Sequence, residues 1–223
     1  MKKCVAAVVW LSLLSLGHSA PLGSCDRLVE PITISNEELL GRWLYVGGSS
    51  DLPGSRSLGH LITSDQMDVT ATSQSNILNL IQTQRIYGTQ NCSSLTYNVT
   101  FENNTLLIEK PFYLREVYLT TDCSDCLVIH EEVVSGKHTF TSLMLFSRRR
   151  SVSPDVVEML KAQADCLRMP SPIMMDTDYE ICPDNISPSE GISALNSINS
   201  FLEFKMGLRV ARFLDALFDR FVN

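Results

Sequence analysis

The feature that most constrains this chain is a run of eight short strand-like segments between residues 42 and 148. Each is rich in Val, Ile, Leu, Thr, Tyr and Phe with alternating polar residues, a pattern typical of half-buried β-strands. Turn sequences such as Glu102-Asn-Asn separate neighbouring segments at hairpin length. The pattern favours an all-β fold, an eight-stranded antiparallel up-and-down barrel without free sheet edges, with a β-sandwich as the alternative. The segments are Trp43–Gly47, Asp68–Thr72, Leu78–Tyr87, Leu95–Phe101, Thr105–Glu109, Tyr113–Thr121, Leu127–Val134 and His138–Phe146.

Residues 1–20 have the pattern of a secretory signal peptide. Two lysines precede an apolar stretch that ends at Leu16, and small residues close the segment at Ala20. The stretch is too short to span a bilayer. We therefore expect a secreted, extracellular protein with a main domain over residues 21–183, followed by a linker and helical tail over residues 184–223.

Net charge restricts the partners. Without the two lysines of the expected signal peptide, 16 basic residues remain against 25 acidic residues, a net charge of −9. A chain of this charge is a poor candidate for binding nucleic acid through its overall field, and it mildly favours cationic ligands.

Cysteines and glycosylation sequons agree with an oxidising, extracellular compartment. Six cysteines and four Asn-X-Ser/Thr sequons follow the expected signal peptide. An even number of cysteines in a secreted chain suggests three disulfides, and each sequon suggests a surface asparagine that carries a glycan. The residues are Cys25, Cys92, Cys123, Cys126, Cys166 and Cys182, and Asn91, Asn98, Asn103 and Asn185.

Two helices are predicted after the strands. Ser153 and Pro154 form an N-terminal helix signal, and Pro170 ends the apolar stripe that follows, so this helix should pack outside the barrel. The tail from Met206 to Phe221 separates apolar from charged residues on a helical wheel. Its apolar face could meet the barrel wall, a partner helix, or a lipid or lipoprotein surface.

Two short motifs and the terminal blocks of the main domain resemble the lipocalins. Gly41-Arg-Trp resembles the opening motif of that family, and Leu145-Phe-Ser-Arg148 resembles its third motif. The block from Cys25 to Thr33 and the blocks around Cys166 and Cys182 are similar to the alpha-1-acid glycoprotein (orosomucoid) group and its toxin-binding relatives from fish. Apolipoprotein M, a lipocalin with a similar cysteine frame, is the nearest alternative.

The resemblance implies a cup-shaped barrel that carries small lipophilic, including cationic, molecules in extracellular fluid. It implies disulfides Cys25–Cys166 and Cys92–Cys182. It also implies that Trp43 closes the barrel floor and that Arg148 packs across the ring of this tryptophan, where a cation–π contact contributes ~0.5–2 kcal/mol.

Cys123 departs from the second lipocalin motif, which usually reads Thr-Asp-Tyr where this chain has Thr121-Asp-Cys. Cys126 follows three residues later, which suggests a disulfide within a turn. Because His130 and Glu131 complete a ligand-like spacing, a redox or zinc site is the alternative. The oxidising compartment favours the disulfide, so no metal is expected.

Catalytic constellations are not evident in the sequence. None of the three histidines after the signal peptide lies in a nucleophile-elbow context, so we expect a binding protein without a cofactor rather than an enzyme. We expect a monomer that holds its ligand inside the barrel. Strand alternation leaves open which residues of each strand face inward, and the ligand-binding candidates are Tyr87, Arg115, Tyr118 and His130.

Overall fold

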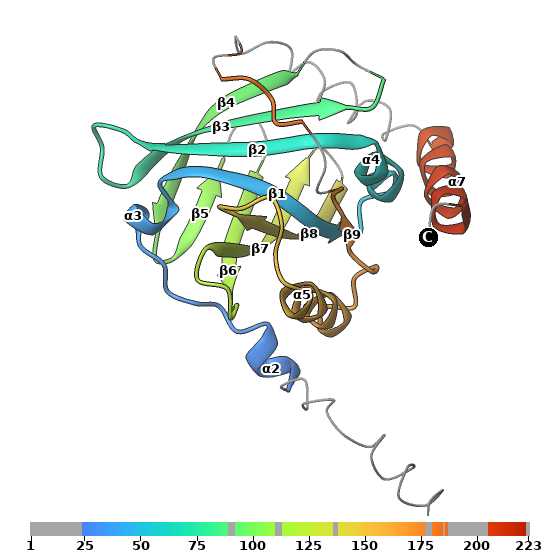
Figure 1. The fold of residues 1–223 in the computed structure, drawn as a ribbon, viewed down its shortest axis with the longest axis horizontal. Helices are drawn as coiled ribbons and strands as arrows, with labels where there is room; N and C mark the ends of the chain where they lie inside the picture. Colours follow the sequence, from blue (N-terminus) through green and yellow to red (C-terminus); the bar gives the residue numbers. More distant parts are fainter. Residues whose placement is uncertain are drawn as a thin grey trace, which may run out of the picture.

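The computed structural model describes residues 24–88, 92–109, 113–135, 138–176, 180–184, 186 and 205–221. Within these ranges the strands form one antiparallel sheet in the order β2-β3-β4-β5-β6-β7-β8-β1, with the short β9 beside β1. Because β1 also pairs with β2, the first eight strands close into a barrel (Figure 1), which confirms the predicted fold class. The strands are β1 (Gly41–Ser50), β2 (Ile62–Ala71), β3 (Ile77–Ile86), β4 (Ser93–Glu102), β5 (Thr105–Ile108), β6 (Tyr113–Leu119), β7 (Cys126–Ser135), β8 (His138–Ser147) and β9 (Ile173–Met174).

Strand β1 closes the barrel because it has two long neighbours. Its first four residues pair with β2, and its residues from Leu44 to Ser50 pair with β8. The register with β8 shifts between Tyr45 and Gly47, an irregularity that bends a strand and increases its twist. The strand therefore runs along the barrel from one end, at Gly41, to the other, at Ser50.

Alternate side chains of the strands enter two separate apolar clusters, as the period of two in a β-strand requires. One cluster fills the barrel interior, and the other lies on the outer wall beneath a helix. The interior cluster includes Trp43, Leu78, Leu80, Val99, Leu114, Tyr118, Ile129 and Phe146. The outer cluster includes Val46, Val117, Leu119, Val128, Leu143, Leu145, Leu160 and Ala164.

The described helices are α2 (Cys25–Leu28), α3 (Asn36–Leu39), α4 (Ser55–Leu61), α5 (Pro154–Cys166) and α7 (Lys205–Phe221). Helix α5 begins at the predicted proline and packs on the outer wall (Figure 1), where Gln163 donates to the carbonyl oxygens of Leu28 at 2.8 Å and Thr120 at 2.9 Å. Helix α3 starts with a capping box between Ser35 and Glu38. None of the described helices is long and apolar enough to cross a bilayer.

Disulfides tie the segments at either end of the domain to the barrel. Cys25–Cys166 joins α2 to α5, and Cys92–Cys182 joins the start of β4 to the segment after β9. These bonds close loops of 141 and 90 residues, and each contributes about 4–5 kcal/mol in the chain-entropy treatment. Cys123–Cys126 spans the turn before β7.

Candidate ligand-binding site

One end of the barrel, which we call the closed end, is blocked by Trp43. Its side chain is 3% exposed, and its indole N–H donates to the carbonyl oxygen of Leu39 at 2.8 Å. The guanidinium carbon of Arg148 lies 3.4 Å from the centre of the indole ring. The guanidinium also donates to three backbone carbonyls within residues 38–42, at 2.6 to 3.1 Å. The polar groups of this plug are therefore hydrogen-bonded.

A row of polar side chains crosses the interior wall on four neighbouring strands. Glu116 of β6 is the register partner of Glu131 of β7, which is the partner of Ser142 of β8, which is the partner of Ser50 of β1. The Ser142 and Ser50 hydroxyls lie 3.1 Å apart. Directly opposed residues on one face have Cβ atoms about 5 Å apart. The carboxyl groups of Glu116 and Glu131 are therefore neighbours.

Alternation along the strands places both glutamates inside the barrel. Glu116 lies between Leu114 and Tyr118, and both of these belong to the interior cluster. Glu131 lies between Ile129 and Val133, which belong to the same cluster. Glu132, the next residue, is exposed on the outside.

A third carboxyl group, that of Asp65, enters the interior from β2. Its side chain is buried, and the described hydrogen bonds to it come from the amide of Gln82, at 3.4 Å to both carboxylate oxygens. The charges of all three acids act on the phenol of Tyr97. Its pKa is raised first by burial and then by the charges of Glu116, Glu131 and Asp65.

Burial makes all three acids harder to ionise. Desolvation raises the pKa of Asp65 to about 7, opposed by the hydrogen bond from Gln82. Desolvation also raises the pKa of Glu116 and Glu131 above the usual range of a glutamate, and the Glu131 charge raises that of Glu116 further. A nearby positive charge reverses such shifts because it favours the carboxylate. The interior therefore opposes ionisation of these acids unless a positive charge lies near them.

Aromatic and apolar side chains surround these acids. Tyr45 meets Phe146 edge-on at 5.5 Å between ring centres, and Phe101 meets Tyr118 in the same way at 6.3 Å. A Cβ atom on Gly48 would lie 2.7 Å from the Tyr45 hydroxyl, so the glycine makes room for this phenol. Several inward-facing side chains that pack against the interior cluster are only partly buried: Tyr45, Met67, Tyr97, Phe140 and Met144.

The structure separates the four ligand-binding candidates. Tyr118 is 2% exposed and lies in the interior. Arg115 is exposed on the outer face of β6, and His130 is partly buried on the outer face of β7, where burial and the Arg115 charge lower its pKa. Tyr87 is 75% exposed just beyond β3. Arg115, His130 and Tyr87 therefore do not line the interior, which corrects their selection from the sequence.

The reason for this correction is the outer cluster beneath α5. Val117 and Leu119 of β6 and Val128 of β7 belong to that cluster, so every second residue from them also points outward. The sequence offered one signal for the interior acids: Glu116 alternates with the apolar Leu114 and Tyr118. Glu131 entered the sequence interpretation only as a zinc ligand.

The zinc alternative is not assembled in the described part of the chain. The sulfur atoms of Cys123 and Cys126 are bonded to each other, whereas zinc binds thiolates. His130 and Glu131 lie on opposite faces of β7.

The sequons differ in how far the structure describes them. Asn98 and Asn103 are exposed. Asn103 and Asn104 form the β4–β5 hairpin with φ of 52° and 60°, as a turn with two left-handed residues requires. Asn91 and Asn185 lie outside the described residues.

A cavity of about 390 Å³ lies between α4, β9 and the adjoining ends of β2 and β3. Its wall carries both charge signs, and Arg85 donates to Glu180 at 3.1 Å beside it. The interior differs from this cavity because its described charged side chains are acidic.

Comparison with known proteins supports the fold. No protein-family model matches the sequence, and no curated protein matches it. Among solved structures, the siderocalin Ex-FABP, described as functioning through dual ligand specificities, is 17% identical with a TM-score of 0.55, over 67% of this chain and 97% of that one. The siderocalin Q83, described as having a dual ligand binding mode, is 16% identical with a TM-score of 0.56, over 68% and 97%. Together with the closed eight-stranded barrel, these likenesses show that the chain has the lipocalin fold.

Proposed function

We propose that this protein binds a small lipophilic cation inside its barrel and carries it in extracellular fluid. The observation that supports the proposal most directly is the convergence of Asp65, Glu116 and Glu131 on one apolar interior. Small-molecule sites typically combine such an apolar lining with a few polar groups that orient the ligand.

The ionised forms of the three acids are unfavourable for two reasons. Burial opposes each charge, and Glu116 and Glu131 repel each other across the strands. A bound ammonium or guanidinium group would relieve both problems, because it pairs with the carboxylates.

The surroundings favour an organic cation over a hydrated metal ion. Ca²⁺ takes six to eight oxygen ligands, whereas the carboxyl groups of the three acids do not gather within metal-ligand distance of one another in the described part of the chain. Aromatic faces such as those of Tyr45, Tyr97 and Tyr118 attract organic cations, with about 0.5–2 kcal/mol for each contact. The apolar part of the ligand would contact the methionine and phenylalanine side chains of the same lining.

Binding and carriage, rather than catalysis, agree with the other features. The two siderocalins are described by their ligand specificities or ligand binding mode. The expected signal peptide, the three disulfides and the exposed sequon asparagines Asn98 and Asn103 support a secreted glycoprotein.

A matched ligand pair tests the proposal. An aryl-alkyl trimethylammonium probe and its neutral tert-butyl isostere have the same shape and differ in charge. Trp43 reports binding by its fluorescence, because Trp10 lies in the expected signal peptide. We expect the cation to bind at least tenfold more tightly than its isostere, which corresponds to about 1.4 kcal/mol.

Two isosteric variants locate the charge that is responsible. Glu131→Gln should abolish the preference for the cation, whereas Glu132→Gln, one residue away on the outer face, should leave it unchanged. Equal affinity for the two probes in the wild-type protein would rule out the cation site and leave only a carrier of neutral lipophiles.

A further inference from the structure

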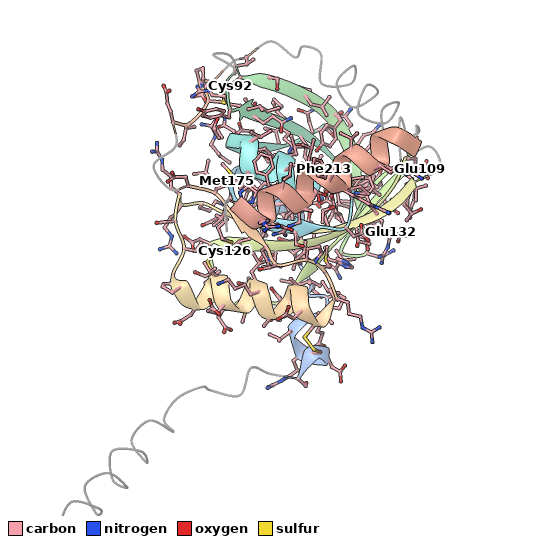
Figure 2. All side chains as sticks on the ribbon, turned by 90° about the vertical axis from the view of Figure 1, so that its right-hand side faces the viewer. Cys92, Glu109, Cys126, Glu132, Met175 and Phe213 are labelled. Atoms are coloured by element: carbon pink, nitrogen blue, oxygen red, sulfur yellow. A yellow bond between two sulfur atoms is a disulfide. The ribbon has the colours of Figure 1, made fainter. Side chains whose placement is uncertain are left out.

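Helix α7 lies at the end of the barrel opposite Trp43, which we call the far end. It packs against α4, which lies in the connection between the end of β1 and the start of β2. Figure 1 shows α3 at one end of the barrel and α4 with α7 at the other. In Figure 2, where this far end faces the viewer, α7 runs across it.

Polar contacts hold α7 in this position. The carboxylate of Asp215 accepts hydrogen bonds from the backbone N–H groups of Gly54 at 2.7 Å and Ser57 at 2.9 Å, and from the Ser57 hydroxyl at 3.0 Å. Asp219 forms an ion pair with Arg56 of α4. These contacts fix the rotation of α7 about its axis.

The apolar contacts of α7 with α4 are few. Ala211 is buried against Gly54, where an added Cβ atom would lie 3.3 Å away, and Phe218 stacks on His60 with ring centres 5.6 Å apart. The helix therefore docks through a narrow edge that mixes small, acidic and aromatic residues, rather than through its apolar face.

The apolar face of α7 consequently remains in contact with solvent. Val210 is 42% exposed, Phe213 is 62% exposed and Leu214 is 41% exposed, and they are adjacent on the helix surface because they are three and four residues apart. Figure 2 labels Phe213 near the middle of the helix. Such a cluster of exposed large side chains on a secreted domain indicates an interaction surface.

The charged side chains of α7 are divided between the side that contacts α4 and the exposed side. The helix has four basic and two acidic side chains. Both acids, Asp215 and Asp219, are engaged with α4, while Arg209 and Arg212 are exposed. The part of α7 that is free to meet a partner is therefore apolar and cationic.

We propose that this surface binds anionic phospholipid, with α7 lying in the plane of the headgroups. Basic residues beside a large apolar face are the pattern of an interfacial helix. A second copy of the chain fits less well: apposing two α7 faces would bring arginines together, with the acids of both helices already engaged. Binding through α7 would bring the far end of the barrel close to the lipid. If the barrel carries a lipophilic cation, as we propose above, the ligand would then enter or leave next to the bilayer.

Flotation of the mature protein with vesicles tests this surface. We expect it to float with vesicles of phosphatidylcholine and phosphatidylserine, and at least fivefold less with phosphatidylcholine alone. Phe213→Glu should reduce flotation at least tenfold. Ala71→Glu is the matched control, because it adds the same charge at an exposed position of β2, near the closed end and outside α7, and it should reduce flotation less than twofold.

Three outcomes would overturn the proposal: no flotation of the wild-type protein, equal loss in the two glutamate variants, or a dimer in sedimentation that Phe213→Glu dissociates. Leu214→Gln provides a second, uncharged substitution in the same face. Binding of the trimethylammonium probe, measured on the same preparations, shows whether each variant is folded. It also separates failure of the lipid surface from failure of the barrel site.

Discussion

The two ends of the barrel interior have opposite chemistry. At the closed end, the N–H of Trp43 is hydrogen-bonded, its ring is covered by Arg148, and the guanidinium donates to backbone carbonyls. Farther along the interior, Asp65, Glu116 and Glu131 are placed in an apolar environment that opposes their ionisation. Satisfied buried groups add stability, whereas buried acids without a cation lower it. The contrast indicates a structural closed end and a binding region beyond it.

The largest expected effect is at the closed end. Trp43→Ala should lower the free energy of unfolding by about 3–5 kcal/mol, because it removes a buried aromatic side chain and leaves a cavity. Urea denaturation followed by far-UV circular dichroism measures this loss without relying on the deleted fluorophore. A loss below about 1 kcal/mol would contradict a structural role for this residue.

The next effect on stability is expected at Arg148, which lies over the indole ring of Trp43. Arg148→Met keeps an apolar stem over the indole but loses the cation–π contact and the hydrogen bonds to residues 38–42, so we expect a loss of about 2 kcal/mol. Arg149→Met is the matched control. It removes only a surface ion pair with Asp125 and should change stability by less than about 1 kcal/mol.

A substitution in the binding region should raise the free energy of unfolding, whereas the two substitutions above lower it. Asp65 has a folded-state pKa of about 7 against an ordinary value of 3.8, so its ionisation destabilises the fold progressively as pH rises from about 4 to about 7. Asp65→Asn should therefore stabilise the protein by up to about 4 kcal/mol at pH 8 and by only about 0.5 kcal/mol at pH 4. Denaturation at both pH values measures the difference.

Asp68→Asn, on the same strand, is the control for this sign. Asp68 pairs with Arg42 at 2.8 Å on the outer face, so its loss should give no stabilisation at pH 8. If Asp65→Asn instead lowered the free energy of unfolding by a similar amount at both pH values, the buried carboxyl would stabilise the fold rather than oppose it.

The barrel was predictable from the sequence because its signals are local. Strand alternation, hairpin turns and the Ser153-Pro helix start all act within a few residues, and β1 to β8 follow one another around the barrel with short connections. The pairs Cys25–Cys166 and Cys92–Cys182 could be anticipated only through the resemblance to a family, since six cysteines allow 15 pairings, whereas close spacing suggested Cys123–Cys126.

The interior acids were not predictable in this way. Which face of β6 and β7 points inward depends on α5, which lies far along the chain and covers Val117 and Val128. The convergence of Asp65 with Glu131 depends on closure of the barrel, a long-range property. The tail shows the same limit: its helical wheel revealed an apolar face, but the contacts of Asp215 with Gly54 and Ser57 decide which face stays exposed.

The smallest expected effect is on ligand affinity. It tests whether the acids that resist ionisation are the same groups that attract the cation. A quaternary ammonium probe keeps its charge at every pH, so any pH dependence of its affinity comes from the protein. Protonation of a carboxyl with a pKa near 7 removes most of its attraction for the cation, so affinity should fall about tenfold from pH 8 to pH 6. Isothermal titration at these two pH values measures the change. The neutral tert-butyl isostere should bind equally at both, and Glu131→Gln should flatten the dependence. A cation affinity that is independent of pH would mean that these acids stay ionised in the folded protein or lie away from the ligand. Either result would remove the contrast between a satisfied closed end and a binding region of strained acids.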